Sequence, residues 1–273
     1  MSTDLTVTTF PAPEELNRAV TVLETLGALY QRIEPSPEQS LVALPALVMS
    51  REVRGRLQAA APTITYSGWV DYRASDVETP QEPPQEPSPG DCYRRSTIMF
   101  LGSCVADETK IRLISHLEGD LGPALPYLNA VIPQASYTPA AETLTFMAGY
   151  RMIALYRQRI TIAKADEIVD AWRTLAGIRQ LAEQTWNDRN TIEPSFEARK
   201  KPPAIEIFKR LPRNNCGRCG EPTCLAFATR VWAGGASVRL CLPVFEESDK
   251  FYYLREALLE ICAGMGIKAG EQA

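Results

Sequence analysis

Residues 142–165 read ETLTFMAGYRMIALYRQRITIAKA, and a helical pattern follows over residues 166–190. The quoted stretch holds three runs rich in β-branched and aromatic residues, ETLTFMA, YRMIALY and RITIAKA, separated by polar residues or glycine, which predicts three strands. The segment after them predicts one long amphipathic helix with both of its tryptophans in the core. The apolar side of that helix consists of Ile168, Val169, Trp172, Leu175 and Trp186.

The residues before this stretch extend the same unit. STIMFLGSCV (96–105) and KIRLISHL (110–117) are strand candidates, and residues 121–131 predict a short helix. Residues 96–193 are therefore expected to form an α/β domain that ends in the long helix.

Residues 1–75 predict a second, smaller α/β domain. LTVTTF (5–10) and SLVALPALV (40–48) indicate strands, and residues 13–29 and 49–60 indicate helices. The apolar side of the first helix would consist of Leu16, Val20, Val22, Leu23, Leu26 and Leu29. Between the two domains, TPQEPPQEPSPG (79–90) has five prolines, so residues 76–95 are expected to form an extended linker.

Composition and charge limit the classes of function and the cellular location that we expect. The net charge of −4 gives no sign of a nucleic-acid or membrane-surface partner. We expect a cytoplasmic protein without membrane insertion, because no secretory signal and no run of about 18 apolar residues is present. The chain has seven cysteines, an odd number, which favours metal ligands over a disulfide framework.

The stretch NNCGRCGEPTC (214–224) concentrates three of these cysteines, and the next follows at Cys241. The candidate ligands of a metal cofactor are Cys216, Cys219, Cys224 and Cys241, spaced C-x2-C-x4-C-x16-C. A cubane [4Fe–4S] cluster uses four thiolates, one for each iron. Zinc is the main alternative, although its structural sites usually show two separated ligand pairs. Plant-type [2Fe–2S] ferredoxins have the reverse order of spacings.

The residues around these cysteines suit a cluster loop. Gly217 and Gly220 allow backbone conformations that other residues avoid. Pro222 and Thr223 are typical of a helix start, so Cys224 should lie in the first turn of a helix, where partial positive charge favours a thiolate. Three arginines flank the ligands and either offset the charge of a cluster or are solvated surface: Arg213, Arg218 and Arg239.

Residues 204–241 resemble a known [4Fe–4S] domain. The shared pattern is Leu211-Pro212, then Asn215 to Gly220, Thr223-Cys224 and Phe227-Ala228, closed by Cys241. This domain is found in the large subunit of the corrinoid/iron–sulfur protein, in the gamma subunit of acetyl-CoA decarbonylase/synthase and in the B subunit of Rnf-type complexes. The resemblance covers about 40 residues. It implies the [4Fe–4S] cofactor, and it does not extend to corrinoid chemistry or ion transport.

The other reactive residues give no catalytic set. Cys92, beside the linker, is expected to be exposed, whereas Cys104 and Cys262 read as core. His116 is the single histidine, and we expect it to have a structural and not a catalytic role. Because the sequence shows no nucleophile–base pair and no phosphate-binding loop, it does not indicate which reaction, if any, the protein catalyses.

The sequence thus predicts an α+β protein with two small α/β domains, a compact [4Fe–4S] module (194–245) and a C-terminal helix within residues 246–273. The favoured function is one-electron transfer to or from a redox partner protein or metalloenzyme in anaerobic or low-potential metabolism. Two alternatives stay open: an accessory protein that stores or delivers a cluster, and an interaction protein with a structural metal. The sequence leaves open whether the chain is an enzyme and how it oligomerises.

Overall fold

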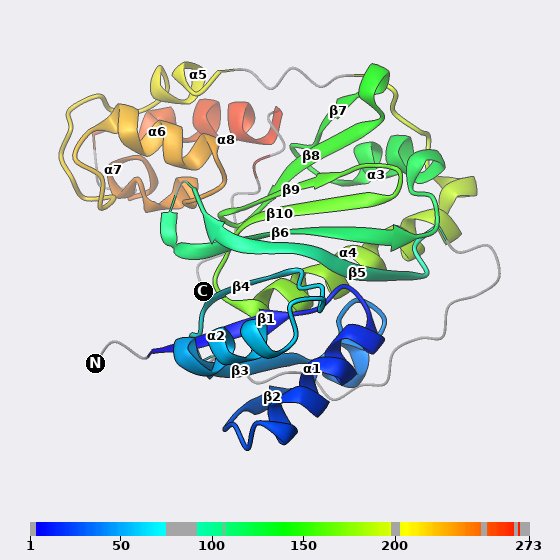
Figure 1. Ribbon diagram of the computed structural model, residues 1–273. Helices are drawn as coiled ribbons and strands as arrows, with labels where there is room; N and C mark the ends of the chain where they lie inside the picture. The colour runs from blue at the N-terminus through cyan, green and yellow to red at the C-terminus, as the bar shows by residue number, and fades with distance from the viewer. Residues whose placement is uncertain are drawn as a thin grey trace.

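The computed structural model describes residues 4–74, 92–105, 107–197, 203–246, 250–264 and 267. Most of the expected proline-rich linker, residues 75–91, lies outside the described residues. The rest combines helices with one mixed sheet, so the fold class is α+β as predicted (Figure 1). No helix among the described residues has the length and apolar character needed to cross a membrane.

Ten strands of the described residues form a single sheet in the order β2-β3-β1-β4-β5-β6-β10-β9-β8-β7. The strands are β1 Leu5–Thr9, β2 Gln31–Ile33, β3 Ala46–Ser50, β4 Gly68–Asp71, β5 Arg95–Cys104, β6 Asp107–Glu118, β7 Ser136–Thr138, β8 Thr143–Ala148, β9 Arg151–Leu155 and β10 Arg159–Ala165. The three strands predicted from residues 142–165 are therefore present as β8, β9 and β10, and the two predicted before them are β5 and β6. Neighbouring strands pair antiparallel, except β4 and β5.

The pair β4–β5 joins the two halves of the sheet. Its parallel register brings Gly68 beside Leu101. Gly68 has a φ of +149°, and a Cβ at this position would lie 2.0 Å from the Leu101 carbonyl oxygen, so only glycine allows the approach. The two expected α/β units therefore share one continuous sheet, while the domain boundaries themselves stay a prediction.

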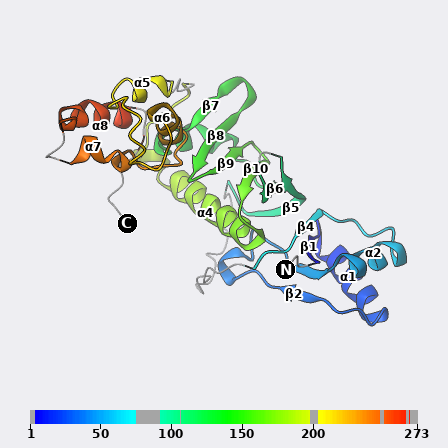
Figure 2. The same ribbon diagram turned by 90° about the vertical axis from the view of Figure 1, so that its left-hand side faces the viewer.

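Helices cover the two faces of this sheet unequally. The α-helices of the described residues are α1 Pro13–Thr25, α2 Arg51–Ala60, α3 Leu125–Val131, α4 Ile168–Asn187, α5 Ile205–Phe208, α6 Cys224–Trp232, α7 Leu242–Phe245 and α8 Arg255–Gly264. The long helix α4 runs along one face and links the two halves in a common core, which contains Val7 and Val48 from the first half and Trp172 from α4 (Figure 2). On the opposite face, α1 and α2 enclose a smaller core around Leu47 and Met49.

The predicted long helix is present as α4, somewhat shorter than residues 166–190. It begins after Glu167, whose carboxylate accepts hydrogen bonds from the amides of Val169 and Asp170. Trp172 is fully buried, as predicted, and Trp186 is half-buried with its ring edge-on to Tyr127 at 6.1 Å. The short helix expected at residues 121–131 is present as a 3₁₀ turn, Gly122–Ala124, followed by α3.

Three boundary predictions in the N-terminal half were wrong. Helix α1 ends at Thr25, because Gly27 adopts a left-handed φ of +59° and stops it, so Leu29 is 89% exposed instead of packing. Strand β3 covers residues 46–50, because residues 40–42 form a turn and residues 43–45 have no regular structure. Ser50 therefore ends the strand and caps α2, its hydroxyl accepting from the Val53 amide at 3.1 Å.

The C-terminal helices form a separate layer at one end of the sheet, beside β7–β9 (Figure 1). Helices α5, α6, α7 and α8 share a third core, whose fully buried members include Ile207, Phe227, Val231 and Leu258. The C-terminal helix predicted within residues 246–273 is described as α8, preceded by a 3₁₀ turn, Tyr252–Leu254. Residues 247–249, 265–266 and 268–273 of that range lie outside the described residues. We call residues 203–246 together with α8 the C-terminal module.

Candidate metal centre

The predicted ligand cysteines lie in two short segments of the C-terminal module. Cys216 and Cys219 belong to the loop between α5 and α6, where the first is exposed and the second half-buried. Cys224 is the first residue of α6, as predicted, and Cys241 lies between the 3₁₀ turn Val238–Leu240 and α7. Both of these are buried.

The loop before α6 is wound by left-handed residues. Arg213, Asn215, Gly217 and Gly220 have φ values of +57°, +49°, +71° and +85°. The Gly220 amide donates to the Gly217 carbonyl at 2.9 Å, which closes a tight turn between Cys216 and Cys219. A Cβ at either glycine would meet no atom within 4 Å, so a side chain would fit at both positions. Glycine is favoured there only because the backbone is left-handed.

Two side chains fix the start of α6. The Thr223 hydroxyl accepts from the Ala226 amide at 3.1 Å and caps the helix. The Asn215 side-chain oxygen accepts from the Cys224 amide at 2.9 Å, across nine positions of sequence. This bond ties the entry of the loop to the helix that carries Cys224. This role of Asn215 was not predicted from the sequence. Asparagine beside a cysteine-rich turn is nevertheless a signal, because it tolerates left-handed backbone better than most residues.

Burial differs between the two sides of the cysteine group. Cys224 and Cys241 are 7% and 5% exposed and belong to the core of the C-terminal module, while Cys219 packs against that core. Cys216 faces solvent. A group bound by all four thiols would therefore have one apolar, protected side and one side open to solvent.

Burial and the neighbouring thiols both act on the pKa of Cys241. Burial, followed by the neighbouring Cys219, Cys224 and Cys216, raises the pKa of Cys241 to about 12, although the backbone at Val244 opposes the shift by hydrogen bonding. Because metal ligation requires the thiolate, cofactor binding here must release protons.

The four predicted ligands are thiols, a donor type that suits both iron–sulfur clusters and zinc. Among the described residues, no three His, Cys, Asp or Glu side chains are gathered closely enough to hold one metal ion. A cubane cluster instead distributes its four thiolates over four irons, so its ligands stand further apart.

The arginines around the loop differ in their contacts. Arg218 pairs with Glu246 at 2.5 Å, which links the loop to the end of α7. Arg239 lies over the Phe245 ring at 5.6 Å. Arg213 is exposed and forms no ion pair with any described residue. The first two stabilise the loop and α7, at the modest level expected of exposed contacts.

The other cysteines and the histidine lie apart from this group. Cys104 and Cys262 are buried, as predicted. The expectation that Cys92 is exposed was wrong: it is 5% exposed, and its sulfur lies 3.8 Å from the Ala182 carbonyl oxygen of α4, because the chain has already entered the main core before β5 begins. His116 is exposed on β6.

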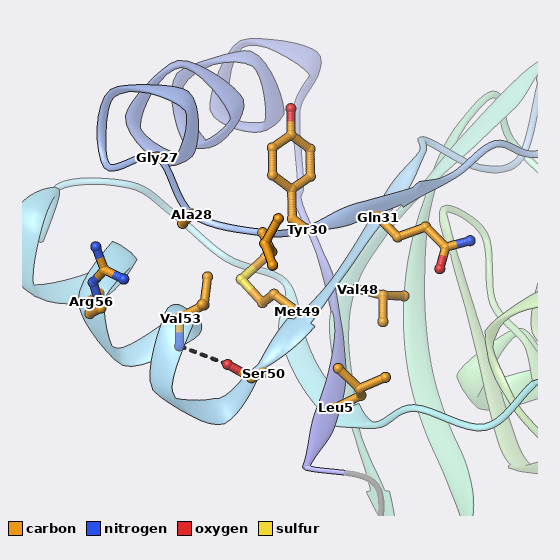
Figure 3. A pocket seen from close by; sticks show the side chains of 11 residues that line it. Leu5, Gly27, Ala28, Tyr30, Gln31, Val48, Met49, Ser50, Val53 and Arg56 are labelled. Carbon is orange, nitrogen blue, oxygen red and sulfur yellow. Dashed lines mark hydrogen bonds between the residues drawn. The ribbon is translucent and has the colours of Figure 1, made fainter.

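A cavity of about 560 Å³ lies far from the cysteines in sequence, in the N-terminal half of the chain (Figure 3). Ala28, Tyr30, Met49 and Val53 line it, and Arg56 stands at its side. None of the four predicted ligands contributes to it. The cavity belongs to the α1–α2 layer and has no contact with the candidate metal centre.

Comparison with known proteins identifies the class of the C-terminal module. Residues 211–243 match the family model "FeS: Putative Fe-S cluster". This range contains all four predicted ligands. The chain therefore carries an iron–sulfur cluster domain, and the resemblance inferred from the motif is confirmed.

Several known proteins match one segment of the chain. The corrinoid/iron–sulfur protein large subunit of Moorella thermoacetica is 57% identical over 37 residues, which is 14% of this chain and 8% of the relative. The acetyl-CoA decarbonylase/synthase complex subunit gamma of Methanocaldococcus jannaschii is 42% identical over 55 residues (19% and 11%). Subunit gamma 1 of Methanosarcina thermophila is 35% identical over 72 residues (24% and 15%).

These matches therefore span less than a sixth of each relative. No solved structure matches the chain. The comparisons support an iron–sulfur protein, and two of the three relatives are named as subunits of complexes.

Proposed function

We propose that this chain is a [4Fe–4S] protein that transfers single electrons to or from a protein partner in anaerobic or low-potential metabolism. Cys216, Cys219, Cys224 and Cys241 are the proposed ligands. The observation that supports the proposal is the loop of residues 213–224, which carries three of the proposed ligands, contains four left-handed residues and is tied to the start of α6 by the Asn215–Cys224 bond. The seven free cysteines favour a reducing compartment, the cytoplasm.

The residues of this chain would bind and tune the cofactor, which when bound supplies a reversible one-electron couple. The partial positive charge at the start of α6 would lie beside Cys224 and offset part of the negative charge of a bound cluster. Apolar neighbours such as Phe227 and Val231 exclude water from the side of Cys224 and Cys241. The exposed side at Cys216 leaves a short path to a docked partner.

Repeated reduction and reoxidation under anaerobic conditions tests this function. The protein is cycled with dithionite and a mild oxidant, and electron paramagnetic resonance follows each reduced state. We expect a signal that returns in every cycle with the iron content unchanged. A cofactor that stays silent to reduction would contradict electron transfer. Cys104→Ser is the matched control, because Cys104 is a buried cysteine outside the ligand group.

Cluster delivery is the second candidate, and the exposure of Cys216 favours it, because an acceptor protein can reach that ligand. Incubation with a cluster-free acceptor separates the two functions. A carrier of electrons keeps its iron, whereas a delivery protein loses iron to the acceptor. Corrinoid chemistry, which the name of one relative suggests, is not part of the proposal, because the match to that relative covers 37 residues.

A further inference from the structure

Half of the sheet has one face without helices. Helices α3 and α4 cover one face of β5–β10, and α1 and α2 cover the other face only over the N-terminal strands (Figures 1 and 2). Within the described part of the chain, no helix covers the second face of β5, β6 and β8–β10. We call it the open face and define it by Met99, Arg112, Ile114, Met147, Met152 and Arg159.

Strand register places Arg112, Met147 and Met152 on one surface, and Met99 lies at the β5 bulge beside Phe100, the residue paired with Ile114. Ala163 of β10 lies between Arg112 and Met152, and Met152 lies opposite Met147. Directly opposed residues of antiparallel strands point to the same face. The row Arg112–Ala163–Met152–Met147 therefore crosses four strands on the open face.

The composition of the open face is that of a protein interface. Met99, Met147 and Met152 are 49%, 36% and 51% exposed. Methionine and arginine are enriched where proteins bind one another, and methionine adapts to the shape of a partner. Single exposed apolar residues are common on protein surfaces, whereas several on one face indicate an interaction site.

Two arginines give the open face positive charge. The Arg112 guanidinium lies 5.0 Å from the Phe100 ring centroid, and the Arg159 guanidinium lies 4.1 Å from that of Tyr156. Neither has a carboxylate partner among the described residues, unlike Arg151, which pairs with Asp166 and Asp170. Stacking on a ring orders a guanidinium in advance and leaves its donors available to incoming carboxylates. Because the whole chain has a net charge of −4, this positive charge is a local feature.

The open face adjoins the C-terminal module. A Cβ at Gly234, just after α6, would lie 3.7 Å from the Gly149 carbonyl oxygen and 3.9 Å from the Met147 Cβ. Helix α6 has nine residues and begins at Cys224, so its first residue is about 12–14 Å along the helix from this contact. A partner on the open face would thus also stand beside the helix that carries a proposed ligand.

We propose that the open face is the docking surface for an acidic electron-transfer protein with exposed apolar side chains. The inference rests on the proposed function for the electron-transfer part, while docking itself is measurable without it. Carboxylates of the partner would pair with Arg112 and Arg159, and its apolar side chains would cover the three methionines.

Binding of an acidic [2Fe–2S] ferredoxin to the anaerobically purified protein tests the proposal. Calorimetry gives the dissociation constant at several salt concentrations, and methionine oxidation footprinting locates the contact. We expect binding that weakens with salt, together with protection of Met99, Met147 and Met152. Cytochrome c, a basic protein, is the control probe and should protect none of them. Absence of ferredoxin binding, or binding without protection, would overturn the proposal.

The double variant Arg112→Glu/Arg159→Glu should weaken ferredoxin binding at least about tenfold and flatten its salt dependence. The control is the double variant Arg32→Glu/Arg56→Glu, which changes the net charge by the same amount but lies on β2 and α2, away from the open face. It should alter ferredoxin binding less than about twofold. Equal binding by both variants would refute the docking surface. Protection that grows with protein concentration in the absence of a probe would assign the open face to a second copy of this chain and refute the proposal as well.

The two proposals fail separately. Loss of reversible reduction with intact, salt-dependent ferredoxin binding would refute electron transfer alone. Reversible reduction by dithionite without ferredoxin binding would refute the docking surface alone.

Discussion

Substitution of Asn215 gives the most direct view of how the candidate metal centre is built. Its side-chain oxygen accepts from the Cys224 amide at 2.9 Å, and its backbone has a left-handed φ of +49°. Asn215→Ala removes the hydrogen bond and places alanine in a conformation that it disfavours. Asn215→Gly removes the bond and relieves the conformation, and Asn215→Asp keeps an acceptor in place.

The expected costs follow from these two effects. A hydrogen bond contributes about 1 kcal/mol net, and a left-handed alanine costs roughly 1 kcal/mol more than asparagine or glycine there. The free energy for opening α6 should therefore fall by about 2 kcal/mol in Asn215→Ala and by about 1 kcal/mol in Asn215→Gly. It should stay within about 0.5 kcal/mol of the original protein in Asn215→Asp, since the helix start favours a negative charge.

Hydrogen exchange of the α6 backbone amides measures these differences. At 1.4 kcal/mol for each tenfold change, exchange should accelerate about 30-fold in the alanine variant and about fivefold in the glycine variant. Peptides from α4 (Ile168–Asn187) belong to a different core and serve as the internal control. Exchange in Asn215→Ala at the original rate would refute the role of this bond, and so would an aspartate variant as fast as the alanine variant.

Three further predictions concern the cap, a charge network and the thiols. Thr223→Ala should lower the stability of α6 by about 1 kcal/mol in urea unfolding, whereas Thr223→Ser keeps the capping hydroxyl and should match the original protein. Partial burial raises the pKa of Asp166, but hydrogen bonds from Lys110 and Tyr150 outweigh it and hold that pKa below its usual value. The contribution of Asp166 to stability is therefore present above about pH 4 and lost as pH falls through the lowered pKa. The melting temperature of Asp166→Asn should accordingly depend less on pH below about pH 4 than that of the original protein. An unchanged pH dependence would contradict this. In cluster-free protein, iodoacetamide should modify Cys216 first and should modify Cys92, Cys104 and Cys262 only on unfolding, as mass spectrometry can check; early labelling of Cys92 would contradict its burial against α4.

The sequence predicted best where local patterns and long-range packing agree. Strands β8 and β10 alternate in burial over most of their length, so the period of two was visible in the sequence, whereas β9 ends in three buried residues. Strands β2 and β7 have three residues each and are too short to show any period. The end of α1 was misplaced because Leu26 and Leu29 continued the apolar pattern, whereas the left-handed Gly27 decided the boundary.

Contacts between distant segments were the part that the sequence did not reveal. The approach of Gly68 to Leu101, which merges the two halves into one sheet, spans 33 positions and depends on a glycine in a region without other signals. For the candidate metal centre, cysteine spacing and glycines predicted the loop, and Pro222 and Thr223 predicted the start of α6. The bond from Asn215 to Cys224 required the fold of the loop, because backbone conformation and not residue type brings the two together.

Anaerobic purification followed by iron and acid-labile sulfide analysis tests the central claim, that four cysteines of the C-terminal module hold an iron–sulfur cluster. The original protein and Cys104→Ser should contain about four irons and about four sulfides per chain. Serine variants of Cys216, Cys219, Cys224 and Cys241 should each lose most of both. About one zinc per chain with no sulfide would contradict the account, as would serine variants that keep their full iron and sulfide content.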